Sequence, residues 1–413
     1  MEDFKEYRLE NLGEFCKGTG IPKSSIIKGG QYKAIRYAEL YTRYGIIIKE
    51  VFSRVGSKDI GSSKQIKYGD ILLAGSGEDL KDIGKTAVYA LYEPCYVGGD
   101  TIIFRPKENQ DGIYLGYLFN TENLIRQRMK YGQGNSIVHI YTRDLAKMKV
   151  RIPLFQEQKE IVSIIEKWDK HIELLDQKIQ IKKNIRKYLT QKLLNGEKRL
   201  PGFKEDWRLS RLGEIGFFKT SSIDKKIKDG ESIVNLVNYM DVYRHKEITN
   251  ANRKNLMRVS AKDDQIRNNN LIKGDILFTP SSETPDDIGH SIVISEDLSN
   301  TLYSYHLVRF RPSISLDIKF AHYFCNQNEV LRQFTKYASG VTRFTLSLDS
   351  FSRVEVKIPP FKEQKAISSI LSKSDEEITM LEKQKNIIEE QRKYLLNNLV
   401  TGEIRLPKFR INK

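Results

Sequence analysis

The chain has 413 residues, a length that excludes one ordinary compact core and suits two or three domains. Its 69 Lys and Arg outnumber 53 Asp and Glu, and the net charge of +16 favours a polyanionic partner, with nucleic acid ahead of a membrane surface. The amino end lacks the pattern of a signal peptide, and no stretch approaches the roughly 18 apolar residues of a spanning helix. We therefore expect a cytoplasmic protein with no role in the membrane.

The three cysteines, Cys16, Cys95 and Cys325, are far apart and form no CxxC pair. This number and spacing predict neither a disulfide framework nor a zinc finger, so we expect buried small hydrophobic residues. The six histidines show no HExxH or other metal-ligand spacing. The sequence therefore predicts no metal and no cofactor bound to this chain.

The sequence is an internal repeat. When Lys149 is placed over Glu355, the segment KVRIPLFQEQKEIVSII matches EVKIPPFKEQKAISSIL, and the match continues without a gap to NGEKRLPGF over TGEIRLPKF. Further upstream, GDIL at Gly69 pairs with GDIL at Gly274. We also pair RLENLGE near the amino end with RLSRLGE at the start of the second half. A period of this length makes the repeating unit a domain.

Each half has a variable front of about 150 residues and a closely matched back of about 50, sizes typical of a domain and a long helix. Phe203-Lys204-Glu205 opens the second half, and Phe4-Lys5-Glu6 is its expected counterpart at the amino end. The carboxyl end stops where that segment would begin again. The two halves should therefore be related by a pseudo-two-fold axis, with the termini close together.

The matched backs are predicted to be long helices. After Glu157 the apolar residues follow the 4,3 spacing of a heptad seam, starting at Ile161 and Ile165, and the second copy starts at Ile367. Gly196 and Gly402 follow as stop signals. A seam this narrow favours a helix pair over a helix packed on its own domain, and the two-fold axis makes the coiled coil antiparallel.

Four cations interrupt this seam, namely Lys182, Arg186, Lys385 and Arg392. A cation at such a position can fix the register of a helix pair, or it can mark a place where the helices splay into solvent. We favour the splayed arrangement.

Several fragments imitate catalytic motifs, and the repeat serves as an internal control. Gly75-Ser76-Gly77 resembles an S-adenosylmethionine loop, but the second half has Thr279-Pro280-Ser281-Ser282 there. Gly84-Lys85-Thr86 resembles a P-loop, but its first glycine would fall on Asp79. We therefore expect no catalytic residue and no enzyme activity in this chain.

One catalytic alternative remains open. Asp286, Asp287 and Glu355 could hold Mg²⁺ and activate water in a metal-dependent DNA nuclease. The position that matches Glu355 is Lys149, and a solvated turn explains the acidic pair equally well. A third possibility, a coiled-coil scaffold without a DNA role, fits the net charge poorly.

The polar segments around the best-matched framework residues are the candidate DNA-reading surfaces, because base-edge contacts specify sequence and phosphate contacts position the protein. Any one of these residues could instead be an ordinary solvated loop residue. Lys130 and Lys336 suit phosphate contacts better than base reading. The candidates are Arg36, Tyr41, Thr42, Arg43, Ser76, Lys85, Lys130, Gln133, Asn135 and Ser136 in the first half, and Asn238, Tyr243, Arg244, Lys246, Ser281, Ser282, His290, Lys336, Ser339, Thr342 and Arg343 in the second.

The duplicated order of these motifs resembles the specificity subunit of a type I restriction-modification system over essentially the full length. The carriers are the fronts that open near RLxxLGE and contain GDIL, the Ile-Pro-x-x-Phe-x-Glu-Gln junctions ending at Gln158 and Gln364, and the helices ending at Leu-x-x-Gly-Glu. No single motif is specific, but the order of the duplicated set is.

The resemblance implies an α/β (α+β) protein with two target recognition domains, separated by two long helices that form an antiparallel coiled coil. Each domain would read one half of a bipartite asymmetric DNA site, and the helices would set the spacer. The implied segments are recognition domains at 1–155 and 199–360, conserved helices at 156–198 and 361–405, and a tail at 406–413.

The resemblance also implies partners. Two modification subunits would bind S-adenosylmethionine and methylate adenine, and restriction subunits would use ATP and Mg²⁺ to translocate and cut DNA. The conserved helices would dock the modification subunits. The candidate partner surface is Gln158, Lys187, Tyr188, Gln364, Lys393 and Tyr394, although the two tyrosines could equally serve helix packing.

Overall fold

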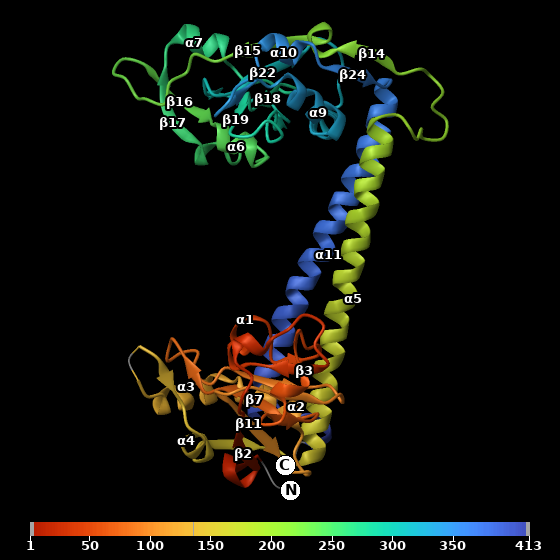
Figure 1. Cartoon of the computed structure of the whole chain (residues 1–413). Coiled ribbons are helices and arrows are strands. Elements are labelled where there is room, and N and C mark those ends of the chain that lie inside the picture. The colour runs from red at the N-terminus through yellow and green to blue at the C-terminus, as the bar shows by residue number, and fades with distance from the viewer. Residues whose placement is uncertain (1–3, 135, 410–413) are drawn as a thin grey trace. The chain divides into compact units, whose positions relative to one another are not determined.

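A computed structural model describes residues 4–134 and 136–409. The chain forms two compact units, the first built from residues 1–176 and 384–413 and the second from residues 177–383 (Figure 1). Each unit combines sheets and short helices with segments of two long helices, α5 (Phe155–Leu194) and α11 (Phe361–Thr401). The expected α/β (α+β) class with two repeated domains and two long helices is confirmed.

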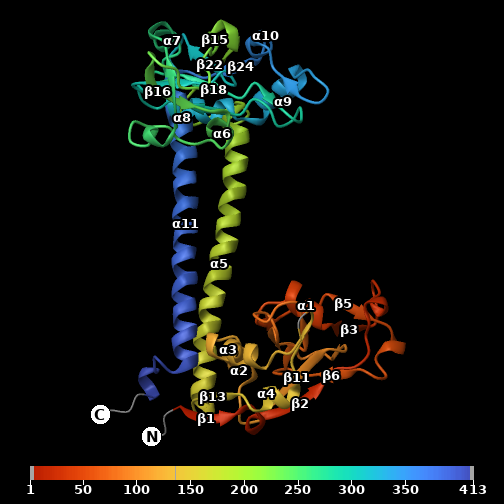
Figure 2. The same cartoon turned by 90° about the vertical axis from the view of Figure 1, so that its left-hand side faces the viewer.

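The first unit contains two main sheets and two ribbons. The five-stranded sheet has the order β2 (Gly13–Lys17), β11 (Thr101–Pro106), β7 (Ile71–Ala74), β9 (Thr86–Tyr89) and β4 (Ile47–Ile48). The four-stranded sheet has the order β5 (Ser53–Val55), β3 (Tyr32–Ile35), β10 (Cys95–Val97) and β6 (Lys64–Ile66). The ribbons are β1 (Lys5–Arg8) with β13 (Lys149–Ile152), seen side by side in Figure 2, and β8 (Ser76–Gly77) with β12 (Val138–His139). The helices are α1 (Tyr37–Thr42), α2 (Gly112–Phe119), α3 (Glu122–Tyr131) and α4 (Thr142–Ala146).

The second unit repeats this plan. Its four-stranded sheet has the order β15 (Gly216–Thr220), β22 (Val308–Pro312), β18 (Ile276–Phe278) and β20 (Ser291–Val293), and its three-stranded sheet has β17 (Met257–Ala261), β16 (Ser232–Val237) and β21 (Thr301–Tyr303). The ribbons are β14 (Arg208–Arg211) with β24 (Glu355–Ile358), and β19 (Ser281–Ser282) with β23 (Phe344–Thr345). The helices are α6 (Tyr239–Tyr243), α7 (Asp263–Asn268), α8 (Ile318–Cys325), α9 (Asn328–Tyr337) and α10 (Leu348–Ser352).

The core of each unit includes the start of one long helix and the end of the other. In the first unit, Ile161 and Ile165 of α5 are buried in one cluster with Leu399 and Val400 of α11. The Tyr114 hydroxyl of α2 also donates to the Val400 carbonyl oxygen at 2.9 Å. In the second unit the matching residues are Ile367 and Leu371 of α11, with Leu193 and Leu194 of α5. The variable fronts are therefore packed directly onto the helices.

The structure corrects the register of the repeat near the amino end. Sequence matching pairs Leu9 with Leu209, but Leu9 is fully buried and Leu209 is 64% exposed. The ribbons and the 3₁₀ helices that follow them pair Leu9 with Leu212 instead, which is 2% exposed. In the structure, the two Leu-Gly-Glu segments are therefore a few positions out of register with each other. The matching leucines are the ones that are buried in the core.

The same shift changes the partner of Phe4. A side chain on Gly402 would meet the Phe4 ring, and a side chain on Gly196 would meet the Trp207 ring. Phe4 therefore matches Trp207, and its expected pairing with Phe203 is wrong. Because Phe4 also lies 5.4 Å below the Arg405 guanidinium, the described ends of the chain are in contact, as expected.

The cations in the helix seam form ion pairs. In the first unit Arg392 lies 2.5 Å from Asp169 and Lys385 lies 2.6 Å from Asp176. Residue numbers rise along α5 as they fall along α11, so the segments run antiparallel. These cations are less than a third exposed, and the splayed arrangement is therefore wrong for them.

The second unit repeats this arrangement. Arg186 lies 2.9 Å from Asp375, and Lys182 lies 2.8 Å from Glu377. Tyr323 of α8 adds its hydroxyl, which donates to the same Asp375 at 2.6 Å. A half-buried cation in a seam is stabilised by an acid across it, and the heptad pattern, which counts apolar residues, does not reveal that acid.

The Glu-Gln motif at the start of each long helix is buried. The Gln158 side chain accepts from the Asp111 backbone N–H at 2.9 Å and donates to the Pro153 carbonyl oxygen at 3.0 Å. Gln364 makes the same two bonds to Asp317 and Pro359, at 2.9 Å each. Neither glutamine is exposed. The expected partner surface is corrected accordingly, since these two residues join the helix to the front of their own unit.

The neighbouring glutamates are buried as well. Glu157 lies 2.7 Å from Arg405 in the first unit, and Glu363 lies 2.7 Å from Arg199 in the second. The Trp207 indole N–H also donates to Glu363 at 2.9 Å. Each arginine follows the end of one long helix and neutralises a carboxylate at the start of the other.

Replacing Arg405 by alanine should lower the free energy of unfolding of the first unit by about 3 kcal/mol, because a buried carboxylate loses its partner. Urea unfolding of the full chain, followed by circular dichroism, measures this loss. Lys408→Ala is the control, since Lys408 is exposed where it pairs with Glu160, and its removal should leave stability unchanged. Equal losses in both variants would contradict the buried pair.

Candidate nucleic-acid interface

In the first unit, three segments meet around Ser76. The Tyr41 hydroxyl of α1 donates to the Ser76 carbonyl oxygen at 2.9 Å, and Ser76 pairs with His139 in the β8–β12 ribbon. His139 also exchanges backbone hydrogen bonds with Gln133, which closes a hairpin after α3. Burial raises the pKa of Tyr41 to about 12, so its hydroxyl remains a hydrogen-bond donor. The structure therefore brings together Tyr41, Ser76 and Gln133.

The second unit builds the same cluster with a different tyrosine. The Tyr239 hydroxyl donates to the Ser281 carbonyl oxygen at 2.8 Å, and Ser281 pairs with Thr345 in the β19–β23 ribbon. Arg343 donates to the Ser281 hydroxyl at 3.0 Å, and Ser339 closes the hairpin against Thr345. Sequence reasoning missed Tyr239. Tyr239 stands four residues before Tyr243, which puts the two rings on one helix face, where they stack. This i, i+4 spacing is the sequence signal that points to it.

A glycine opens each hairpin. Gly134 and Gly340 have φ of 118° and 141°, and a side chain on either would lie about 2 Å from the carbonyl oxygen three residues later. The tips that follow expose apolar side chains, with Ile137 56% and Val341 92% exposed. Sequence reasoning missed both, although an apolar residue in a polar loop is a usable signal. Asn135 lies outside the described residues.

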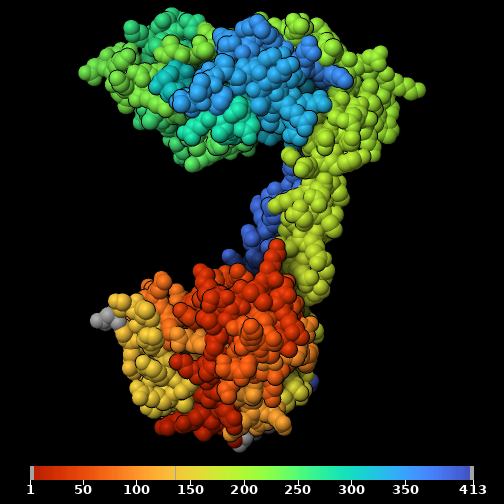
Figure 3. Space-filling view, viewed as in Figure 1, coloured from red at the N-terminus to blue at the C-terminus, as the bar shows by residue number. Residues whose placement is uncertain are grey.

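The hairpin region of the first unit lies at one edge of that unit, as the yellow segment on the left of the lower unit in Figure 3 shows. Beside it is a pocket of about 510 Å³, lined by tyrosines of α1, by Ser76 and by carboxylates. Carboxylates and hydroxyls can accept hydrogen bonds from the amino groups of cytosine or adenine. The residues that line the pocket include Tyr37, Tyr41, Thr42, Ser76, Glu78, Asp79, Asp82 and Ile137.

The other candidates lie around these clusters. Arg36 and Asn238 are the N-cap residues of α1 and α6, and each has a buried polar side-chain atom without a partner, Nε and Oδ1 respectively. Arg43 and Lys246 pair with the acids Glu39 and Asp241 of their own helices. Ser282 is buried, and Lys85 and His290 are half-buried. The exposed candidates are Thr42, Arg43, Lys130, Gln133, Ser136, Arg244, Lys246, Lys336, Ser339, Thr342 and Arg343.

Two of the three acids of the nuclease alternative, Asp287 and Glu355, have other partners. Asp287 accepts from the Tyr243 hydroxyl at 2.9 Å, which raises the pKa of Tyr243, and it lies 2.8 Å from His290. Glu355 belongs to the β14–β24 ribbon and lies 3.8 Å from Arg211. Within residues 4–134 and 136–409, no three His, Cys, Asp or Glu side chains group to hold a metal ion. The metal-dependent nuclease is therefore not supported.

No helix in the described part of the chain is long and apolar enough to span a membrane. Cys95 and Cys325 are buried and Cys16 is half-buried, and all three are free thiols. Burial raises the pKa of Cys95 and of Cys325 to about 12, which suits packing residues and not nucleophiles.

Comparisons with known proteins agree on one family. The chain is 23% identical to the type I restriction enzyme MjaVIII specificity subunit of Methanocaldococcus jannaschii, over 98% of this chain and 94% of that protein. Its fold matches a chain from a solved type I restriction-modification system, with a TM-score of 0.62, 15% identity and 98% and 99% of the two chains covered. It also matches the HsdS subunit of Thermoanaerobacter tengcongensis, with a TM-score of 0.56, 14% identity and 97% of each chain covered.

The family profile described as the type I restriction modification DNA specificity domain matches twice, over residues 1–183 and 204–390. The two matches cover both fronts and most of both long helices. The chain therefore belongs to the type I restriction-modification specificity family, and it is the non-catalytic subunit that recognises DNA.

Proposed function

We propose that each hairpin cluster reads one half of a bipartite, asymmetric DNA site. The observation that carries this proposal is the same construction in both units, a tyrosine hydroxyl bonded to a serine carbonyl beside a short ribbon. The bonds that build the cluster use backbone atoms, so the side chains around them can differ. They do differ, with Ile137 where the second unit has Arg343.

The differing side chains suit different bases. Arg343 can donate two hydrogen bonds to guanine O6 and N7, whereas Ile137 and Val341 suit contact with a thymine methyl group. Lys130 and Lys336 lie exposed in the last turns of α3 and α9, ahead of the hairpins, and contact phosphate. The remaining candidates named from the sequence, including Asn135, keep their proposed DNA-binding role.

Arg343→Ala should cost about 1–3 kcal/mol of binding to the preferred site and relax the preference at one base pair of one half-site. Binding of the assembled complex to DNA libraries randomised in each half-site measures both effects. Lys336→Ala should weaken binding to all sequences. The slope of the log binding constant against log salt concentration should become about 0.9 less steep, the value for one lost phosphate contact. The control is Arg353→Ala, an exposed arginine paired with Asp349. A preference changed in both half-sites would contradict one reader per half-site.

We also propose that the long helices dock two modification subunits, with restriction subunits completing the complex. In the second unit, Ile181, Ile185 and Tyr188 form an exposed stripe along α5. In the first unit, Ile387 and Tyr394 of α11 are exposed at the positions that match Ile181 and Tyr188. One apolar surface presented twice suits one kind of partner bound twice. Lys187 and Lys393 flank the tyrosines and complete the surface.

Ile181→Ser with Tyr188→Ala should weaken binding of one modification subunit at least tenfold, since a buried tyrosine anchor is commonly worth 2 kcal/mol or more. Analytical ultracentrifugation with purified modification subunits should then show one bound subunit where the unmodified chain binds two. Gln180→Ala, also exposed but about 100° round the helix, is the control and should retain both. Two tightly bound subunits on the double variant would exclude this surface.

A further inference from the structure

Two histidines of the second unit face each other. The Nε2 atom of His245 lies 3.4 Å from the Nδ1 atom of His290. His245 follows α6 with a φ of 50°, a left-handed conformation that is uncommon outside glycine and that directs its ring. His290 lies just before β20 and follows Gly289. Neither histidine belongs to a hydrophobic core cluster of the described residues.

The hydrogen-bond partners fix the protons on these rings. The Nε2 atom of His290 lies 2.8 Å from Asp287 Oδ1, and a carboxylate oxygen can only accept, so that nitrogen carries a proton. The Nδ1 atom of His245 lies 3.0 Å from the Ser291 carbonyl oxygen, which also only accepts. In the neutral rings, the two facing nitrogens therefore carry no proton, and each presents a lone pair. Two acceptors at this separation repel unless a proton or a metal cation lies between them.

The separation suits a metal ion. Nitrogens about 2.0–2.1 Å from a tetrahedral zinc ion lie about 3.3 Å apart, close to the 3.4 Å found here. Histidine ligands usually donate their other ring N–H to a carboxylate or a backbone carbonyl, and Asp287 and Ser291 supply one of each. Asp287 is itself held by the Tyr243 hydroxyl at 2.9 Å. The supporting bonds of a metal site are thus in place.

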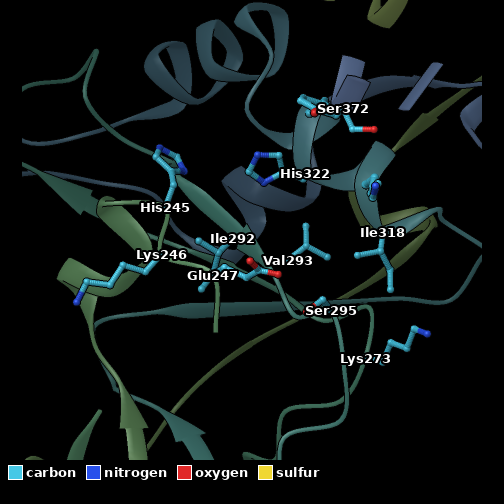
Figure 4. A pocket seen from close by; sticks show the side chains of 12 residues that line it. His245, Lys246, Glu247, Lys273, Ile292, Val293, Ser295, Ile318, His322 and Ser372 are labelled. Atoms are coloured by element: carbon cyan, nitrogen blue, oxygen red, sulfur yellow. The ribbon is translucent and has the colours of Figure 1, made fainter. Parts of the chain in front are cut away.

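Solvent can reach the pair. His245 is exposed and lines a pocket of about 480 Å³ that His322 and Glu247 also line (Figure 4). Over the described residues, no third His, Cys, Asp or Glu completes a ligand group with them. The site would therefore have two protein ligands, one fewer than a catalytic zinc site usually has, with water in the remaining positions.

The first unit provides an internal comparison. Arg43 matches His245, since each stands four residues after the acid that caps its helix, Glu39 or Asp241. Lys85 matches His290, since each follows a glycine with positive φ. The first unit thus has a permanent cation at both positions, and the histidine pair is specific to the second.

We propose that His245 and His290 bind one divalent transition-metal ion, with zinc as the best match to imidazole ligands. The ion joins the end of α6 to the segment before β20. It places positive charge where the first unit has an arginine and a lysine. The proposal stands apart from the DNA-reading role, because metal binding is measured without DNA.

The test is titration of the full chain, purified without a histidine tag, with zinc chloride alone, followed by calorimetry and by metal analysis after dialysis. One zinc ion per chain is expected. His245→Arg with His290→Lys, which installs the residues of the first unit, should weaken binding at least tenfold. Asp287→Ala should weaken it about 10–100-fold by removing the support of His290. His171→Ala is the control, since it removes an exposed histidine of α5, and it should bind as the unmodified chain does.

Heating adds a second readout. Zinc should raise the unfolding temperature of the unmodified chain and leave that of the double variant unchanged, since only a bound ligand stabilises the fold. Absence of saturable zinc binding would overturn the proposal, as would equal binding by the double variant. Magnetic resonance of the ring nitrogens that shows a shared proton and no response to zinc would do the same. DNA binding of the double variant is measured separately and does not enter this test.

Discussion

A buried carboxylate at the start of each long helix is the constraint on which the rest of the structure depends. Glu157 and Glu363 are almost inaccessible to solvent, and an unpaired charge at such a depth is strongly destabilising. Each is neutralised by an arginine from the segment that follows the opposite helix, Arg405 or Arg199. Each ion pair therefore selects one alignment of the end of one long helix against the start of the other. The glutamine beside each glutamate hydrogen-bonds that helix start to the recognition front of the same unit.

The reading clusters separate scaffold from specificity. Their framework consists of tyrosine hydroxyls bonded to serine carbonyls and of short backbone ribbons, which need few particular side chains. The tip residues are therefore free to change without loss of the fold. This arrangement explains why the two fronts share glycine and GDIL positions and diverge between them, as loops on a rigid scaffold commonly do.

The sequence alone predicts the repeat, the long antiparallel helices and the segments that carry the clusters, because heptad spacing and glycine positions are local patterns. It fails where a long-range contact decides. The pairing of Leu9 with Leu212 depends on burial, and the partners of Arg392 and Arg186 are acids on the other helix. Glutamine is a residue type that usually lies at the surface, but the Gln158 side chain hydrogen-bonds to two backbone groups inside the protein. Side-chain type does not reveal such contacts.

The two units also differ in how their parts are ordered along the chain, and this affects biosynthesis. The second unit is one continuous segment, whereas the core of the first joins Ile161 and Ile165 to Leu399 and Val400. At ribosomal rates of about 5–20 residues per second, on the order of tens of seconds pass between the synthesis of the first front and the synthesis of the end of α11 that covers it. During that time its apolar face is open to chaperones and proteases. The unit that is made first is thus the last to be completed, and a chain that breaks off before residue 399 leaves this core exposed.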